Sequence, residues 1–218
     1  MILLTIFAAA SLTNVFPQID ARQRYSFAGS NQLAAQIRQG APADVFASAN
    51  TALPQALYAE GLVEKPVVFT RNALILIVPR SNPAKLRSVY DLRKPGVKLV
   101  VAAKGVPVGD YTRTVLHNLA LDDALGNVVS NESDVREVVA KVALGEADAG
   151  FVYTTDAHAV RGKVATIGIR WSAQPIVQYA VAVVKSSKHL TTARVFVKRL
   201  LAAPGQQKLR AAGFLARK

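Results

Sequence analysis

Four short segments of this chain combine small residues with hydroxyl groups where an apolar run gives way to a helical pattern. They are Ala10-Ser11, Gly29-Ser30, Pro107-Val108-Gly109 and Ser133-Asp134-Val135. Tyr153 adds a phenol at the end of a fifth apolar run. Backbone N–H groups at a helix N-terminus attract anions, and serine and tyrosine hydroxyls donate hydrogen bonds. Together these segments predict a site that holds an anion with uncharged donors, without lysine or arginine.

The first of these segments lies in a stretch with two interpretations, Ile2–Asn14. The apolar run reads as a buried strand that ends at Ser11, where a helical pattern begins and Ser11 caps it. Residues 1–10 also resemble the apolar core of a secretory signal peptide. Because no lysine or arginine precedes the run, and because it is too short to span a bilayer, we favour the first strand of a mature domain. An export signal is then absent from this sequence.

The composition describes a folded protein with a substantial core. The chain has 218 residues, of which 51% are hydrophobic and 19% charged, enough for one large domain or two lobes. There are no cysteines, which excludes disulfides, thiolate metal sites and cysteine catalysis. The three histidines, His117, His158 and His189, are far apart and lack metal-ligand spacing.

The formal charge of +13 raises the question of a nucleic-acid partner. The basic residues that follow Asp156, the last acidic one, fall largely on a helical pattern whose other face is apolar, as Val195 and Leu200 show. This pattern indicates a solvated outer face, and no nucleic-acid-binding motif is present. We therefore expect no nucleic-acid partner, and attraction to an anionic membrane surface or to anions stays open.

Strands alternate with helices along the chain, which predicts an α/β fold with mixed, mostly parallel sheets and helices on both faces. The expected helices begin after Ser30, near Pro54, at about Asp110 after a Gly105–Gly109 turn, at Ser133 and at Thr154, and two more lie within 186–215. After the first strand, the expected strands are Tyr25–Ala28, Asp44–Ala47, Val67–Thr70, Ala73–Pro79, Lys98–Ala103, Ala149–Tyr153, Val164–Ile167 and Val177–Lys185.

The pattern starts afresh after Arg80, and the strand at Val177–Lys185 has no obvious place in the second set. We infer two lobes, 1–79 plus 179–218 and 80–178, joined by two crossover strands with a ligand cleft between them. The first lobe holds 14 basic and 4 acidic residues, and the second holds 13 and 10. Nearly all of the excess positive charge therefore belongs to the first lobe.

Six motifs in this order resemble the molybdate-binding proteins of ABC importers, from Leu4 to Phe214. The motifs are FAAASL (7–12), FAGS (27–30), GAPADVFASA (40–49), VPVGDYTRTVL (106–116), SDVREVV (133–139) and GFVYTTDA (150–157). The resemblance implies a two-lobe, periplasmic-binding-protein-like fold of type II. It also implies that a tetrahedral oxyanion is held between the lobes by uncharged donors.

Carried onto this chain, the family pattern implies that Ser11 and Ser30 each bind the oxyanion through a backbone N–H and a hydroxyl. It implies backbone N–H groups from Val108 and Val135, and the hydroxyl of Tyr153. Molybdenum is then bound only as the oxyanion, through these same residues, with no catalytic residue and no further cofactor.

Three features depart from the family pattern or bear on it. Val108 stands where the family usually has alanine, and Ser30 is the only serine of its loop. Asp110, Glu132 and Asp134 lie beside two of the donor loops, where a carboxylate that faced the site would repel a dianion. We expect these three side chains to point away from the anion.

The resemblance implies an extracytoplasmic or periplasmic binding protein that captures molybdate, and also tungstate, and delivers it to an ABC permease. We expect a monomer that meets the membrane only through the transporter or a lipid anchor. Two alternatives stay open, namely a binding protein for another tetrahedral oxyanion such as sulfate, and an enzyme or effector domain on the same fold. Against an enzyme, the chain has no Gly-x-Ser-x-Gly elbow, no P-loop and no recognisable nucleophile–base pair.

Overall fold

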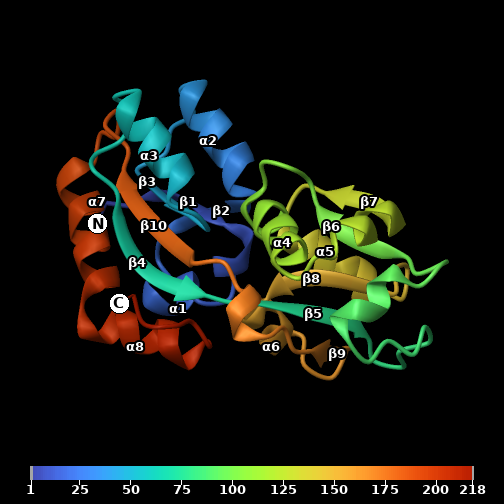
Figure 1. Cartoon of the computed structure of the whole chain (residues 1–218). Helices are drawn as coiled ribbons and strands as arrows, with labels where there is room; N and C mark the ends of the chain where they lie inside the picture. The colour runs from blue at the N-terminus through green and yellow to red at the C-terminus, as the bar shows by residue number, and fades with distance from the viewer. Residues whose placement is uncertain (1, 218) are drawn as a thin grey trace. The chain divides into compact units, whose positions relative to one another are not determined.

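The computed structural model describes residues 2–217, and the chain separates into two units. The first unit comprises the part up to Asn72 and the part from Val177 onward, and the second is Ala73–Ile176 (Figure 1). The boundaries expected at residues 79 and 178 put strand β5 (Leu74–Pro79) in the first lobe. In the structure β5 pairs with strands of the second unit, so the crossovers lie at 72/73 and 176/177.

The first unit is built on a five-stranded sheet of order β2-β1-β3-β10-β4. Strand β1 runs parallel to β2 and β3, whereas β10 is antiparallel to β3 and β4. The strands are β1 (Thr5–Ala9), β2 (Arg24–Ala28), β3 (Val45–Ser48), β4 (Val67–Asn72) and β10 (Val177–Val183). The helices are α1 (Phe16–Ile19), α2 (Ser30–Arg38), α3 (Ala52–Ala59), α7 (Leu190–Leu201) and α8 (Ala203–Ala211), with a 3-10 turn η1 (Ala10–Leu12).

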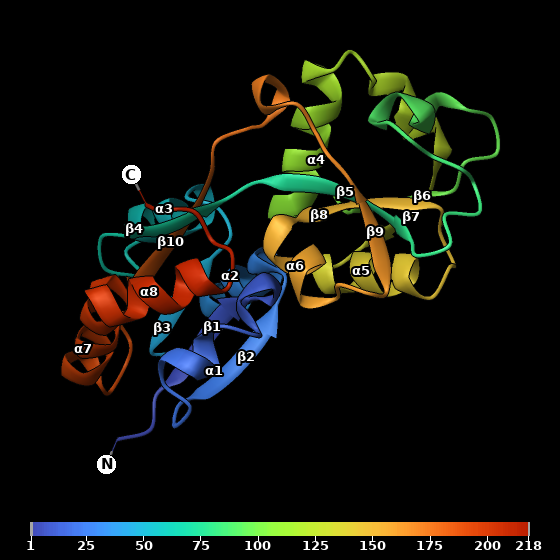
Figure 2. The same ribbon diagram turned by 90° about the horizontal axis from the view of Figure 1, so that it is seen from below.

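Both faces of this sheet are covered. The nearly continuous apolar runs of β1, β3 and β10 require this, because successive side chains of a strand point to opposite faces of the sheet. On one face, Phe7 and Phe46 pack with Leu33 and Ile37 of α2 and Leu57 of α3. The other face carries an aromatic cluster around Phe16, whose ring centroid lies 6.0–6.1 Å from those of Tyr25, Phe69 and Phe196. Helices α7 and α8 lie side by side on the unit (Figures 1 and 2).

The second unit repeats this arrangement, with a sheet of order β7-β6-β8-β5-β9. Strand β6 is parallel to β7 and β8, and β5 is antiparallel to β8 and β9. The other strands are β6 (Leu99–Ala102), β7 (Val128–Glu132), β8 (Ala149–Tyr153) and β9 (Val164–Ile167). The helices are α4 (Pro107–Asn118), α5 (Val135–Ala143) and α6 (Thr154–Ala159), with 3-10 turns η2 (Val89–Arg93), η3 (Asp122–Asn127) and η4 (Trp171–Ala173).

Strand β7 was not expected from the sequence. It lies at one edge of its sheet, and Ser130, Asn131 and Glu132 make up most of it. A half-exposed edge strand needs no continuous apolar run, so the pattern that revealed the central strands is absent. Among residues 2–217, no helix is long and apolar enough to cross a bilayer.

The topology places the predicted donors in two groups. In the first unit, Ser11 follows β1 and Ser30 follows its neighbour β2. In the second, Val108 and Val135 follow β6 and β7, and Tyr153 ends β8, again three adjacent parallel strands. Because the carboxyl ends of parallel strands meet at one edge of a sheet, each unit gathers its own candidates at one edge.

Candidate anion-binding loops

Ser11 is buried in the 3-10 turn η1 rather than at the cap of a helix. Its side chain makes no capping hydrogen bond, and the N-cap of this turn is Ala9. The predicted capping role is therefore wrong, because the chain tightens into a 3-10 turn directly after β1. Instead, Ser11 Oγ lies 2.9 Å from the hydroxyl of Tyr179, and either oxygen can donate. When Tyr179 donates, the hydroxyl proton of Ser11 is available to an anion.

Ser30 is the first residue of α2, whose N-cap is Gly29. Its buried hydroxyl oxygen accepts a hydrogen bond of 3.1 Å from the backbone N–H of Ala49, in the loop after β3. A hydroxyl that accepts one bond keeps its own proton for donation. The contact therefore fixes the position of Ser30 Oγ and leaves it a donor.

Val108 is the second residue of α4, which begins at Pro107 and not near Asp110 as expected. The predicted turn over Gly105–Gly109 is thus helical in its second half, because proline suits the first position of a helix. The N–H groups of the first helical turn have no carbonyl of their own helix to donate to. Val108 is buried, and its backbone N–H stays a predicted anion donor.

Helix α5 begins at Val135, and its N-cap is Asp134 rather than Ser133. Asp134 Oδ1 accepts from the N–H groups of Arg136 at 2.6 Å and Glu137 at 3.3 Å. The N–H of Val135 lies outside this capping pair, at the first position of the helix. Ser133 instead bonds Glu137 Oε2 through its backbone N–H and its hydroxyl, at 2.8 Å each.

The three carboxylates beside the donor loops have partners within the second unit. Asp110 Oδ1 accepts from the N–H of Gly105 at 2.9 Å, and Asp134 caps α5 as described. Glu132 accepts from the hydroxyl of Ser130 and forms an ion pair of 2.8 Å with Lys141. Each group thus stabilises local structure, and their orientation away from a bound anion stays a prediction.

Tyr153 and Asp156 lie together where β8 passes into α6. Tyr153 is the last residue of β8 and the N-cap of α6, and only 1% of its surface is exposed. Asp156, 2% exposed, lies in the first turn of α6 and accepts a backbone hydrogen bond from Tyr153. In the described part of the chain, no donor bonds its second oxygen, Oδ2.

Burial raises the pKa of Asp156 to about 7, against the opposing effects of nearby Arg136 and of the bond from Tyr153. Desolvation also raises the pKa of Asp134. Asp156 was not singled out from the sequence, although it lies in the GFVYTTDA motif, because sequence patterns do not distinguish a helix-capping carboxylate from a fully buried one. Its neighbourhood includes Tyr153 and both chain neighbours of Val135, so Asp156 belongs to the surroundings of the candidate donors.

The structure therefore brings together Ser11 with Ser30, and Val108 with Val135 and Tyr153, each set within its own unit. That the two sets converge on one anion stays a prediction. No cluster of three histidine, aspartate or glutamate side chains in residues 2–217 is arranged to hold a metal ion.

Comparisons with known proteins agree with this architecture. A family described as bacterial extracellular solute-binding protein matches residues 4–215. The molybdate-binding protein ModA of Mycobacterium tuberculosis is 39% identical over 224 residues, covering 97% of this chain and 84% of that protein.

Two solved structures are also similar along the whole chain. A substrate-binding domain from Clostridium difficile, assigned to a molybdenum ABC transporter, is 31% identical with a TM-score of 0.70, covering 99% of both chains. The periplasmic molybdate-binding protein of Azotobacter vinelandii is 21% identical with a TM-score of 0.85, covering 97% of this chain and 98% of that one, which supports the fold. On these grounds the chain belongs to the bacterial extracellular solute-binding protein family, among the relatives called ModA.

Proposed function

We propose that this protein captures molybdate outside the cytoplasm and delivers it to an ABC permease. The observation that carries the proposal is the placement of uncharged donors at the carboxyl ends of adjacent parallel strands in both units. The names of the relatives and of the similar structures support molybdate as the anion. The same placement suits tungstate, which we propose also binds.

The donors differ in chemistry between the two units. From the first unit the anion receives the hydroxyls and backbone N–H groups of Ser11 and Ser30. From the second it receives the backbone N–H groups of Val108 and Val135 and the phenol of Tyr153. Neutral donors at helix starts stabilise a dianion through aligned N–H dipoles and avoid the desolvation of a buried lysine or arginine.

Selection among anions then rests on size. A rigid set of donors matches one distance between anion oxygens, and a smaller anion such as sulfate leaves some donors imperfectly paired. Each unsatisfied buried donor costs about 1–3 kcal/mol, which is enough to favour the larger anion. Molybdate and tungstate are too similar in size for such a set to separate them.

The proposal includes no resident cofactor and no catalysis. Ser11 and Ser30 have hydroxyl or N–H partners and no histidine base among their described hydrogen bonds, so neither is activated as a nucleophile. Molybdenum enters only inside the oxyanion, as cargo. We propose a monomer whose two units suffice for capture.

Isothermal titration of the protein with molybdate, tungstate, sulfate and phosphate tests this function. We expect tight binding of molybdate and tungstate at one site per chain, and sulfate and phosphate binding at least tenfold weaker. Stronger binding of sulfate than of molybdate would reassign the cargo. No heat with any of the four anions, in protein shown to be folded, would overturn the proposal.

A further inference from the structure

The excess positive charge of the first unit gathers away from its donor loops. Strand β10 is antiparallel to β3, with Val183 opposite Val45 and Ala180 opposite Ser48. The residues that follow β10 therefore lie at the amino edge of the sheet, whereas Ser11 and Ser30 lie at the carboxyl edge. Lys185 and Lys188 follow β10 directly and are exposed.

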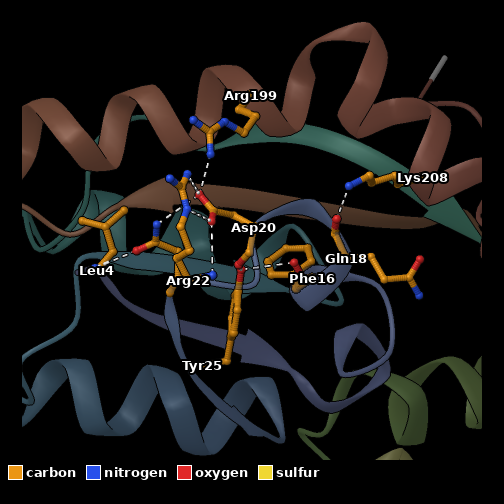
Figure 3. Close-up of polar contacts among 9 residues, drawn as sticks. Leu4, Phe16, Gln18, Asp20, Arg22, Tyr25, Arg199 and Lys208 are labelled. Atoms are coloured by element: carbon orange, nitrogen blue, oxygen red, sulfur yellow. Dashed lines mark hydrogen bonds and ion pairs between the residues drawn. The ribbon is translucent and has the colours of Figure 1, made fainter. Parts of the chain in front are cut away.

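The segment before β2 and the outer face of α7 add further cations to this region. Asp20, buried before β2, accepts hydrogen bonds from Arg22 at 3.0 Å and Gln23 at 3.1 Å and forms an ion pair with Arg199 of α7 (Figure 3). Lys208 of α8 donates to the carbonyl of Gln18 (Figure 3). These bonds hold the terminal helices on the amino-terminal segment. We call the exposed cations here the basic edge: Arg22, Arg24, Lys65, Lys185, Lys188, Arg194, Lys198 and Arg199.

The carboxylates at this edge are already occupied. Asp20 bonds Arg22 and Arg199, and Glu64 pairs with Arg194. Asp44 accepts from the hydroxyl of Ser187 and from the N–H of Thr5. The basic edge therefore has eight basic groups and only three acidic ones nearby. Within residues 2–217, no carboxylate lies within ion-pair distance of Lys185, Lys188 or Lys198.

The position of the basic edge separates it from the anion-binding role. Strand β1 has five residues, so the two edges of the sheet are roughly 15 Å apart. At physiological ionic strength exposed charges are largely screened beyond about 8 Å. The basic edge therefore contributes little to the affinity for a small anion at the other edge.

Apolar side chains lie among these cations. The exposed face of α7 repeats at helical spacing as Thr191, Arg194, Val195, Lys198 and Arg199. Val195 and Ile2 are each 48% exposed and together line a surface cavity of about 240 Å³ that Arg22 and Arg199 also border. Cations interleaved with exposed aliphatic groups suit a surface that carries phosphate headgroups above an apolar layer.

We propose that the basic edge binds the anionic headgroups of a lipid bilayer and holds the protein loosely at the membrane surface. Charge complementarity selects this occupant, because each lysine or arginine near an anionic surface contributes to attraction that salt weakens. The exposed apolar side chains of Ile2 and Val195 favour a bilayer over nucleic acid, because the sugar–phosphate backbone has no apolar layer into which they could insert. The proposal does not depend on the identity of the captured anion.

Co-sedimentation with vesicles tests the proposal. One set contains phosphatidylcholine with one third phosphatidylglycerol, and the other contains phosphatidylcholine alone. The charge-reversal variant carries Lys185→Glu, Lys188→Glu and Lys198→Glu, and its matched control carries Lys85→Glu, Lys98→Glu and Lys163→Glu in the second unit, all exposed. Thermal melting curves without ligand check that both variants are folded, and Lys→Gln versions replace any that are not.

We expect the wild type to bind only the anionic vesicles and to be released at high salt. The basic-edge variant should bind roughly tenfold or more weakly, because the attraction of three lysines to the anionic surface becomes repulsion, and the control should lose much less. An equal loss in both variants would overturn the proposal by making net charge the cause. Absence of vesicle binding at low salt would also overturn the proposal, as would tighter binding to double-stranded DNA than to anionic vesicles. The same holds if the only effect of the basic-edge variant is a slower association rate with molybdate.

Discussion

The two units share one topology and differ in the electrostatics around their donor loops. In each sheet, three parallel strands lie in the spatial order second, first, third along the chain (β2-β1-β3 and β7-β6-β8). Two further strands, each antiparallel to its neighbours, then complete the sheet (β10-β4 and β5-β9). The first unit has four acidic residues, Asp20, Asp44, Glu60 and Glu64, none of them in the Ser11 or Ser30 loop. In the second unit Asp110, Glu132, Asp134 and Asp156 adjoin the loops that carry the candidate donors.

The predicted donors of the two units are positioned in different ways. In the first unit, Ser11 bonds Tyr179 of β10, and Ser30 bonds Ala49 in the loop after β3. In the second unit the candidate donors are N–H groups at helix starts, and carboxylates bond adjacent N–H groups, as Asp134 does for Arg136 and Glu137. A capping carboxylate stabilises a helix start, yet its charge repels an anion. An anion bound at the proposed site would therefore require each of these carboxylates to be paired or neutral.

Gly109→Ala should produce the largest effect and confine it to the second unit. A Cβ at this position would lie less than 3.0 Å from the carbonyl oxygens of Ala102 and Ala103, which are backbone atoms that cannot turn aside. We expect a loss of about 3 kcal/mol or more in the free energy of unfolding, measured by denaturant titration. Gly126→Ala, with no heavy atom within 4 Å, is the control, and similar losses in both variants would contradict this account of the α4 start.

Asp156→Asn should make the stability of the second unit less dependent on pH. The folded-state pKa of about 7 exceeds the ordinary value of 3.8, so the folded protein retains a proton that the unfolded chain releases. The free energy of unfolding of the wild type should therefore fall as pH rises from about 4 to 7, by up to about 4 kcal/mol. Melting curves at pH 5 and 8 measure this, with exposed Asp110→Asn as control, and parallel behaviour of wild type and Asp156→Asn would refute it.

Ser11→Ala and Tyr153→Phe compare one hydroxyl donor from each unit. Each should weaken molybdate binding by about 1–2 kcal/mol in titration calorimetry, because a buried hydrogen bond to the anion is lost. Tyr179→Phe removes the hydroxyl that Ser11 contacts but leaves the donor of Ser11 itself, and it should cost less than half as much. If Tyr179→Phe matches Ser11→Ala, the serine acts only through the tyrosine, and unchanged affinity in Tyr153→Phe removes that residue from the site.

Asp20→Asn should give the smallest effect, confined to the first unit and to mildly acidic or neutral pH. The hydrogen bond from Arg22, with further bonds from Gln23, lowers the pKa of Asp20 to about 2. The carboxylate therefore contributes stability above about pH 4, and this contribution is lost as pH falls toward 2. Because Arg22 is exposed, we expect Asp20→Asn to lose only about 1 kcal/mol in the free energy of unfolding. The variant should melt at a lower temperature than the wild type at pH 7 and at the same temperature at pH 2. A deficit that persists at pH 2 would point to packing instead.

Local sequence was sufficient for the parts of the protein that depend on apolar periodicity and on short motifs. The strands later seen as β2, β3, β6, β8 and β9 follow from runs of β-branched and aromatic residues, and α5 from Val135, Val138, Val139 and Val142 at helical spacing. The family resemblance rests on small residues and hydroxyls at strand ends, which local composition displays directly. The confirmed two-unit α/β fold and the family belong to this part.

Tertiary structure decided what depends on partners distant in the chain. Ser11 reads as a helix cap until Tyr179, 168 residues away, is found beside it, and β5 reads as part of the first lobe until its pairing with β8 and β9 is known. Burial is likewise a property of the assembled unit, so the sequence did not distinguish the exposed Asp110 from the buried Asp156. Hydrogen bonds and desolvation act between neighbours in space, and only the fold makes Asp156 and Arg136 such neighbours.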